Sequence, residues 1–141
     1  MTTAHCLFCR MVAGEIGTAT LFEDAHTLAF LDHRPLFPGH CLLIPKQHHE
    51  TLADLPVELV APLFGNARML ATAVERGMAA EGSFVAINNR VSQSVPHLHI
   101  HIVPRRKKDG LRGFFWPRGK YESAEAMERV RGALRDAIAA G

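Results

Sequence analysis

Three histidines alternate with apolar residues in one short segment of this sequence. The segment covers residues 97–103, carries imidazoles at positions 97, 99 and 101, and lies between two prolines. Because neighbouring side chains of a β-strand point to opposite faces, we expect the imidazoles on one face and the apolar side chains on the other. Imidazoles about 6.5–7 Å apart cannot all be protonated without repulsion, and a neutral, oriented imidazole can attack phosphorus or an acyl carbon. The pattern therefore predicts a nucleophilic centre with at least one neutral histidine at pH 7.

The same alternation has two other interpretations. It could be the polar outer face of a strand that happens to be rich in histidine. It could also bind a metal ion through all three imidazoles, since imidazole is the commonest metal ligand in proteins. Chelation distinguishes this last interpretation, because a metal-dependent hydrolase loses turnover when its metal is removed.

Residues 97–103 resemble the signature of the histidine-triad (HIT) family of nucleotide hydrolases and transferases. Other segments resemble that family in the same order along the chain: 6–9 with 14–16, 28–32, 38–40, 43–48 and 93–96. The match runs from about residue 6 to residue 105. It departs from the family in one place, because the link at residues 90–92 is shorter than the glycine-containing loop of many members.

The resemblance implies that His99, the middle histidine, is the nucleophile. It would attack the α-phosphorus of a nucleotide and form a nucleotidyl-histidine intermediate, which water or another acceptor resolves. His101 and His40 would line the phosphate pocket and donate to its non-bridging oxygens. The expected substrates are purine nucleotide conjugates, such as dinucleoside polyphosphates and nucleoside phosphoramidates, and no organic cofactor is expected. The alternative is a non-catalytic nucleotide-binding protein, or a zinc-stabilised interaction protein, on the same fold.

Five further residues are substrate-binding candidates through the same resemblance: Asp32, Phe30, Asn88, Gln93 and Ser94. Asp32 matches the acid that binds the ribose, since a carboxylate accepts from both ribose hydroxyls, and Phe30 beside it is a candidate wall for the base. The first asparagine of the pair at 88–89 is favoured for the phosphate side. Gln93 and Ser94 offer an amide and a hydroxyl to the phosphates. Without the resemblance, Phe30 would be interpreted as a core residue, and Gln93 and Ser94 as part of an ordinary polar loop.

Cys6 and Cys9 are spaced C-x-x-C, which by itself is compatible with redox chemistry, metal binding or no special role. With His48 and His97 they make a set of two cysteines and two histidines, the type that holds structural zinc. Several bacterial members of the family resemble this sequence in carrying these ligands. Because protein would supply all four ligands, no position would remain for a substrate and the zinc would be structural. The alternative is two small buried thiols, and Cys41, alone in an apolar segment, is expected in the core.

The elements that position these residues can be predicted from the apolar pattern. Short strands are expected at residues 20–22, 27–31, 40–44, 83–88 and 98–103. A long helix should follow Asp54 as its N-cap, with Pro62 kinking it or delaying its start, and Ser123 should cap a C-terminal helix. Strands and helices do not alternate regularly. The expected fold is therefore α+β, with a five-stranded antiparallel sheet, one long central helix and a C-terminal helix.

Length and composition limit the classes of protein that remain. The 141 residues are expected to form a single HIT domain, with residues 6–105 as the core of the match and 106–141 as a basic loop, an aromatic segment and the last helix. A net charge of +2 argues against bulk capture of nucleic acid, so no specific nucleic-acid partner is expected. No apolar run or export signal stands out, so we expect no membrane partner and a cytoplasmic protein.

Two segments near the end of the match have open interpretations. The basic residues 105–108 are either a solvated face or a contact for the distal phosphates of a long substrate. The aromatic residues 114–116 either stack on a base or lie in a subunit interface. We favour the interface, because HIT proteins that resemble this one are usually homodimers. The expected partners are thus a small-molecule nucleotide and a second copy of the chain.

Overall fold

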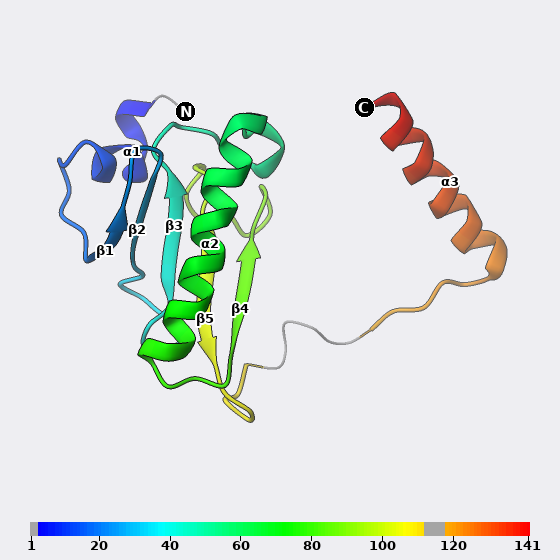
Figure 1. Ribbon diagram of the computed structural model, residues 1–141. Helices are drawn as coiled ribbons and strands as arrows, with labels where there is room; N and C mark the ends of the chain where they lie inside the picture. The colour runs from blue at the N-terminus through cyan, green and yellow to red at the C-terminus, as the bar shows by residue number, and fades with distance from the viewer. Residues whose placement is uncertain (1–2, 112–117) are drawn as a thin grey trace. The chain divides into compact units, whose positions relative to one another are not determined.

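The structure is a computed structural model that describes residues 3–111 and 118–141. The chain divides into two compact units, Met1–Asp109 and Gly110–Gly141, and each is described by itself (Figure 1). The aromatic segment at residues 114–116, predicted to lie in an interface, falls outside the described residues.

The first unit is built on a sheet of five strands in the order β1-β2-β3-β5-β4, with antiparallel pairing throughout. Along the chain the strands are β1 (Thr20–Glu23), β2 (Thr27–Leu31), β3 (Cys41–Pro45), β4 (Gly82–Ile87) and β5 (Ile100–Arg105). The α+β fold and the five-stranded antiparallel sheet predicted from the sequence are confirmed. Because β5 pairs with both β3 and β4, the strand that continues from the three histidines lies in the interior of the sheet.

The long helix α2 (Val57–Gly77) covers one face of this sheet (Figure 1). Its buried side chains recur every three or four residues, which places them on one side of the helix. They pack on alternate strand residues in a single core: Leu59, Leu63, Ala67, Leu70 and Val74 against Ala29, Cys41, Leu43, Leu98, Ile100 and Ile102. Cys41 is therefore a core residue, as predicted, and burial raises the pKa of its thiol to about 11.

The start of α2 differs from the prediction. Asp54 does not cap this helix, because its carboxylate accepts from the backbone N–H and the hydroxyl of Thr51, at 3.0 and 2.7 Å. Thr51 lies three residues before Asp54, the spacing of a capping box, and the two residues close the short 3-10 helix η2 (Leu52–Asp54) instead. The long helix begins at Val57, and Pro62 lies inside it without delaying its start.

Among the described residues, α2 is the one helix that is long and apolar enough to cross a bilayer, with a mean hydropathy of 1.2. Five of its side chains are buried against the sheet. The apolar content of α2 is therefore that of a helix that packs on a core.

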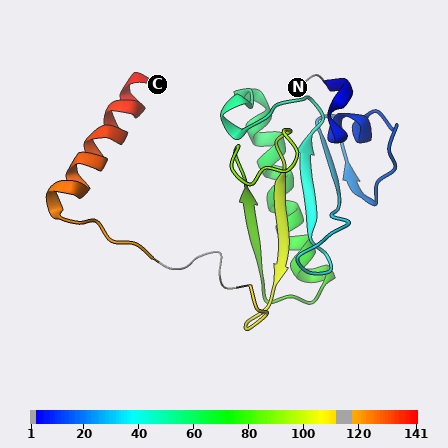
Figure 2. The same cartoon turned by 180° about the vertical axis from the view of Figure 1, so that it is seen from behind.

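The other face of the sheet meets the N-terminal segment, which contains the 3-10 helix η1 (Thr3–His5) and the six-residue helix α1 (Leu7–Val12). The sequence reading did not predict α1. Its N-cap is Cys6, whose sulfur accepts from the backbone N–H of Cys9 at 3.3 Å. Figure 2 shows this face with β3 and β5 in front of α2. A second core forms here from Cys6, Phe8, Leu28, Phe30, Leu42 and Ile44.

The turn between β1 and β2 is tied to α2 through Asp24. One carboxylate oxygen accepts from the backbone N–H groups of His26 and Thr27, at 2.9 and 2.7 Å. The other accepts from the side-chain amide of Asn66 in α2, at 2.8 Å. Burial acts to raise the pKa of Asp24, but the hydrogen bonds from Asn66 and the turn lower it to about 2. The hairpin and the helix thus share one ionised carboxylate.

The second unit contains helix α3 (Ala124–Ala140). Ser123 caps it as predicted, since its hydroxyl accepts from the backbone N–H of Ala126 at 3.0 Å. Four apolar residues spaced three or four positions apart all lie exposed on this helix: Met127, Val130, Leu134 and Ile138.

Candidate active site and metal site

His99 lies in the extended segment immediately before β5, buried on the face of the sheet that also meets Phe8. Its Nδ1 lies 2.7 Å from the backbone carbonyl oxygen of His97. A carbonyl only accepts, so Nδ1 must carry the ring proton and Nε2 is left with a free electron pair. Burial lowers the pKa of His99, although the bond to the His97 carbonyl and the charge of Asp32 oppose this shift. The ring is therefore neutral at pH 7 and has the form that a nucleophile requires.

His40 and His101 lie beside this ring. The His40 Nε2 and His101 Nδ1 atoms are 3.0 Å apart, and the rings of His99 and His101 are 5.0 Å apart between centroids. Burial lowers the pKa of His101 to about 4, assisted by the neighbouring His99 and His40, and burial likewise lowers the pKa of His40. Three predicted catalytic histidines thus meet in one neutral cluster.

Asp32 borders the same cluster from the end of β2. One carboxylate oxygen lies 3.7 Å from His40 Nε2, and the other accepts from the backbone N–H of Arg34 at 2.9 Å. The Asp32 side chain keeps 18% of its surface exposed.

Phe8 is a site residue that the sequence reading missed. Its ring contacts that of His99 edge to face at 5.2 Å between centroids, and that of His97 at 5.8 Å. It also packs on Phe30 at 5.5 Å, and both phenylalanines are buried. The sequence offered one indication of this role: Phe8 lies between Cys6 and Cys9, so a site that holds both cysteines also holds Phe8 in place. Phe30 has the burial of a core residue and contacts Phe8, which in turn contacts His99.

The side-chain amides of Asn89 and Gln93 hold the loop between β4 and the histidine segment. Gln93 donates to the carbonyl of Glu50 at 2.6 Å and accepts from the backbone N–H of Arg90 at 2.8 Å. Asn89 accepts from the backbone N–H of Leu52 at 2.8 Å. Among the described residues, nothing forms a hydrogen bond with the side chain of Asn88. The predicted site residue Gln93 thus joins this loop to the segment after β3 through Glu50, and Ser94 lies exposed beside it.

Cys6, Cys9, His48 and His97 come together at the end of this loop, as the sequence predicted. Their four donor atoms lie within 4.8 Å of one another. The Cys6 sulfur is 3.3 Å from His97 Nδ1, and the Cys9 sulfur is 3.2 Å from His48 Nδ1 and 3.5 Å from His97 Nδ1. A tetrahedral zinc ion with ordinary bond lengths has sulfur-to-nitrogen edges of about 3.5 Å. The donor set therefore fits structural zinc.

The protonation of this set also suits a metal. His97 Nε2 donates to the carbonyl of Pro45 at 2.8 Å, which leaves Nδ1 unprotonated and aimed at the sulfurs. Burial lowers the pKa of His97 to about 4. Burial, with the nearby sulfur of Cys6, raises the pKa of the Cys9 thiol to about 12, so a bound cation is what would hold that sulfur as a thiolate.

The three alternating histidines do not share one metal ion. His97 points at the cysteines, whereas His99 is bonded to a backbone carbonyl and His101 to His40. The interpretation in which all three imidazoles bind one catalytic metal is therefore not supported by their directions.

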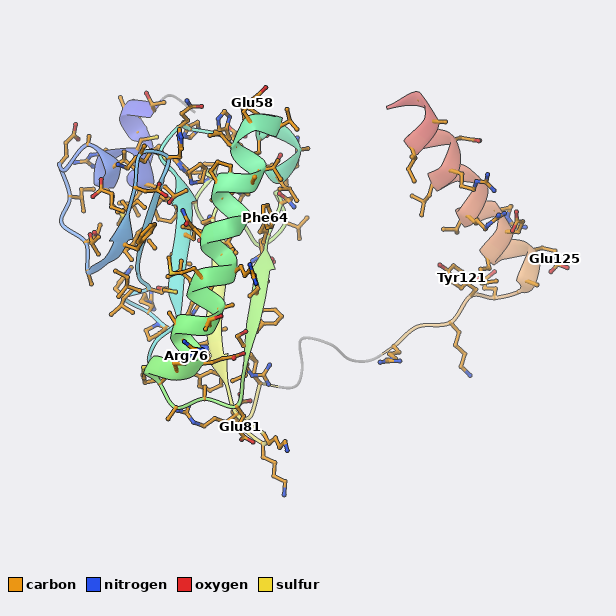
Figure 3. The ribbon with its side chains drawn as sticks, in the orientation of Figure 1. Glu58, Phe64, Arg76, Glu81, Tyr121 and Glu125 are labelled. Atoms are coloured by element: carbon orange, nitrogen blue, oxygen red, sulfur yellow. The ribbon has the colours of Figure 1, made fainter. Side chains whose placement is uncertain are left out.

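The basic turn after β5 is held against the corner between α2 and β4. Arg105 pairs with Asp109 at 2.5 Å, and the Arg106 side chain donates to the carbonyl of Met78. The backbone N–H of Lys107 donates to the carboxylate of Glu81 at 3.0 Å, and Glu81 is labelled at this corner in Figure 3. These contacts favour the interpretation of the turn as a solvated structural corner over a phosphate contact.

Comparison with known protein families finds that the HIT domain model matches residues 13–108. The adenylylsulfatase HINT3 of Arabidopsis thaliana is 35% identical over 108 residues, which are 75% of this chain and 55% of that protein. The adenosine 5'-monophosphoramidase HNT1 of Saccharomyces cerevisiae is 36% identical over 110 residues, 77% of this chain and 68% of that protein. The chain thus spans about half the length of the plant relative.

Solved structures of HIT family proteins are also similar to this chain. A HIT family member from Bacillus subtilis matches with a TM-score of 0.85 and 32% identity, over 94% of this chain and 96% of that one. A Zn-bound histidine triad family protein from Mycobacterium smegmatis matches with a TM-score of 0.73 and 35% identity, over 99% of this chain and 100% of that one.

Proposed function

The chain belongs to the HIT domain family, and on that premise we propose that it is a nucleotide hydrolase or nucleotidyl transferase that acts through His99. Its substrate is a purine nucleotide conjugate, either a dinucleoside polyphosphate or a nucleoside phosphoramidate. Two relatives named as an adenylylsulfatase and a monophosphoramidase support this class of substrate, since both names describe adenosine monophosphate joined to a leaving group.

One observation carries the proposal: the hydrogen bond from His99 Nδ1 to the carbonyl of His97. It leaves Nε2 unprotonated whenever the ring is neutral, and it prevents the ring from turning the wrong nitrogen towards a substrate. The same carbonyl stabilises the positive charge that the ring acquires after attack.

In the first step the electron pair of His99 Nε2 forms a bond to the α-phosphorus. The bond from phosphorus to the leaving group breaks, and the leaving group departs with the electron pair of that bond and takes up a proton from solvent, while the Nε2–H of neutral His101 donates a hydrogen bond to it. The product is a nucleotidyl-histidine, and the His97 carbonyl stabilises the positive charge on its ring.

In the second step a water molecule attacks the same phosphorus and releases a proton to solvent, while the Nε2–H of His101 donates a hydrogen bond to a phosphate oxygen. The phosphorus–nitrogen bond breaks, and its electron pair returns to His99 Nε2. The protein regains its starting state and releases a nucleoside monophosphate. Another nucleophile in place of water would make the reaction a nucleotidyl transfer.

Substrate binding involves the residues at the border of the cluster. Asp32 accepts from the ribose hydroxyls, and Phe30 supports the base from the hydrophobic core beneath it. Asn88 donates to the phosphates, with Gln93 and Ser94 shaping the loop that faces them. The support for Asn88 is that its amide is uncommitted within the described part of the chain, whereas Asn89 is bonded to the Leu52 backbone.

Zinc is proposed at Cys6, Cys9, His48 and His97, where it would supply a structural cross-link. The support is the donor spacing and the relative described as Zn-bound. These residues would join α1 to the segment that carries His99, because Cys9 lies in α1 and His97 lies in that segment. From the same resemblance we propose a homodimer in the cytoplasm, which sedimentation of the purified chain and fractionation of the source cell would examine.

The experiment for the proposed function is a substrate panel with intermediate trapping. The full-length protein is incubated with dinucleoside polyphosphates, nucleoside phosphoramidates, aminoacyl-adenylates, adenylyl sulfate and nucleoside diphosphates, and kcat/KM is compared between classes. Samples denatured at alkaline pH, which preserves a phosphorus–nitrogen bond to histidine, are then examined by mass spectrometry for a nucleotidyl group on the residue 97–103 peptide. We expect turnover of a phosphoramidate or polyphosphate and a mass increment that is absent in His99→Gly. Turnover without any increment at that peptide would exclude the covalent mechanism.

A further inference from the structure

The two ring nitrogens of His40 are both engaged by neighbouring groups. The backbone N–H of Leu36 donates to His40 Nδ1 at 3.0 Å. The Nε2 atom lies 3.0 Å from His101 Nδ1 and 3.7 Å from a carboxylate oxygen of Asp32. With only 3% of its surface exposed, His40 has few contacts with water that could compete.

These contacts determine where the ring protons lie. A backbone N–H only donates, so His40 Nδ1 must accept and carries no proton. A neutral imidazole then holds its single proton on Nε2, which donates to His101 Nδ1. Since His101 Nδ1 is thereby an acceptor, the proton of a neutral His101 must lie on its Nε2.

We propose that His40 is a positioning residue that acts on the substrate through His101, and that the backbone N–H of Leu36 sets its tautomer. In this arrangement His101 keeps a donor N–H on Nε2, whereas His40 has no free N–H for a phosphate. This differs from the expectation from the sequence, in which His40 itself donates to the phosphate oxygens. The catalytic consequence rests on the proposed function, but the tautomers are properties of the free protein.

The loop that carries Leu36 is held firmly enough to act in this way. The backbone N–H of Asp32 donates to the carbonyl of His40, and that of His40 donates to the carbonyl of Phe37, both at 3.0 Å. Gly39 has a φ of +97° and lies so close to Met78 that a β-carbon would be 2.6 Å from its Cγ. The amide of Leu36 is thus presented to His40 by a closed turn.

The same side chains also have the spacing of a metal site, since the donor atoms of Asp32, His40 and His101 lie within 4.8 Å of one another. A cation on His40 Nε2 would move the ring proton to Nδ1. There it would face the N–H of Leu36, donor against donor. The conflict favours a hydrogen-bond relay over a metal site at these residues.

The tautomers can be measured directly in the full-length protein. Nitrogen-15 spectra of the histidine rings at pH 7 distinguish a protonated from an unprotonated ring nitrogen. We expect His40 and His101 to be protonated on Nε2 and unprotonated on Nδ1. His99 should show the reverse pattern, because its Nδ1 donates to a carbonyl, and so serves as an internal control. A proton on His40 Nδ1 would overturn the proposal.

Two substitutions at residue 36 separate the backbone N–H from the side chain. Leu36→Pro removes the N–H, and we expect His40 and His101 to show mixed tautomers and kcat/KM to fall by about tenfold or more. Leu36→Ala keeps the N–H, so the wild-type tautomers should remain. Identical ring spectra in the two variants would show that the Leu36 amide does not set the tautomer.

Two substitutions at residue 40 test whether His40 acts through His101. A glutamine places its amide N–H near the position of the histidine Nε2, whereas an asparagine is too short to reach His101. We expect His40→Gln to keep the tautomer of His101 and most of the rate, and His40→Asn to lose both, with kcat/KM lower by about a hundredfold. Equal losses in the two variants with an unchanged His101 tautomer would make His40 a direct contact of the substrate.

The two proposals fail in different ways. If the wild-type protein turns over no nucleotide conjugate, the proposed function is wrong, while the ring spectra still decide the tautomers. If the proline variant does not fold, the wild-type spectra and the glutamine and asparagine pair remain decisive.

Discussion

At the scale of single residues, the chemistry expected of His99 depends on one main-chain oxygen. The carbonyl of His97 accepts the Nδ1 proton of His99 and so leaves the other nitrogen free. Burial keeps the ring neutral by lowering its pKa. No neighbouring carboxylate is required to extract a proton, because the electron pair is already available.

Removal of this imidazole should abolish turnover without preventing binding. In His99→Ala we expect kcat/KM to fall by about 10³-fold or more, because the attacking atom is gone. Nucleotide affinity, measured by calorimetry, should persist, because Asp32 and the phosphate-side loop are untouched. His26→Ala, an exposed histidine in the β1–β2 turn, is the matched control. Substantial residual turnover in His99→Ala would assign the nucleophile to another residue.

At the scale of secondary-structure elements, Asp24 links the β1–β2 hairpin to α2 through Asn66. The pKa of Asp24 is lowered from 3.8 to about 2 in the folded protein. A lowered carboxyl pKa stabilises the fold above the unfolded-state value, and this stabilisation is lost as the pH falls through the folded-state value.

The pH dependence of stability should reflect this link. We expect the free energy of unfolding to decrease between about pH 4 and pH 2, and Asn66→Ala to lower it by about 1 kcal/mol at pH 7. At pH 2 the variant and the wild type should differ less, because Asp24 is then largely protonated in both. Urea denaturation at several pH values measures this, with Thr72→Ala on the same helix as control. A difference that stays constant with pH would show that Asn66 acts independently of the Asp24 charge.

The turn before β3 is the second element with a specific requirement. A β-carbon on Gly39 would lie 2.6 Å from Met78 Cγ and 3.2 Å from Pro104 Cγ, at a φ of +97°. Gly39→Ala should therefore lower the free energy of unfolding by about 1–3 kcal/mol, through both crowding and backbone conformation.

Gly65→Ala is the matched control for this substitution. Gly65 lies in α2 with nothing within 4 Å of its added β-carbon, and alanine favours a helix. We expect Gly65→Ala to leave stability unchanged or to increase it. Equal urea midpoints for the two variants would contradict the close packing of Gly39.

At the scale of the whole molecule, the metal set connects the N-terminal segment to the centre of the sheet. We expect about one zinc per chain by elemental analysis, and a lower melting temperature after chelation. Turnover should continue as long as the chelated protein stays folded, because no ligand position is open to a substrate. Cys9→Ser should lose the metal, and Cys41→Ala should keep it. If the purified protein contains no zinc and chelation leaves its melting temperature unchanged, the zinc proposal is wrong.

Much of the architecture could be predicted from the sequence, because alternation and helical spacing are local properties. The five strands, the long helix and the Ser123 cap follow from such patterns. The chemically active side chains follow from the alternation of histidines and from the family resemblance. The prediction that Asp54 caps the long helix was wrong, because its carboxylate accepts from Thr51 and closes the short 3-10 helix instead.

What the sequence could not predict are contacts that involve the backbone or depend on how distant segments meet. The His97 carbonyl and the Leu36 N–H are backbone groups of a kind that almost every residue carries. Their roles therefore depend on the geometry of the loops and not on residue type. Phe8 contacts His99 because α1 packs on the face of the sheet that carries this histidine, although the two residues are far apart along the chain.

The double role of His97 has a practical consequence for mutagenesis of this protein. Its ring faces the cysteines that flank α1, while its carbonyl orients the neighbouring imidazole. A substitution of His97 removes a partner of both cysteines and changes the residue whose carbonyl orients His99, so lost turnover in such a variant does not by itself separate the two roles.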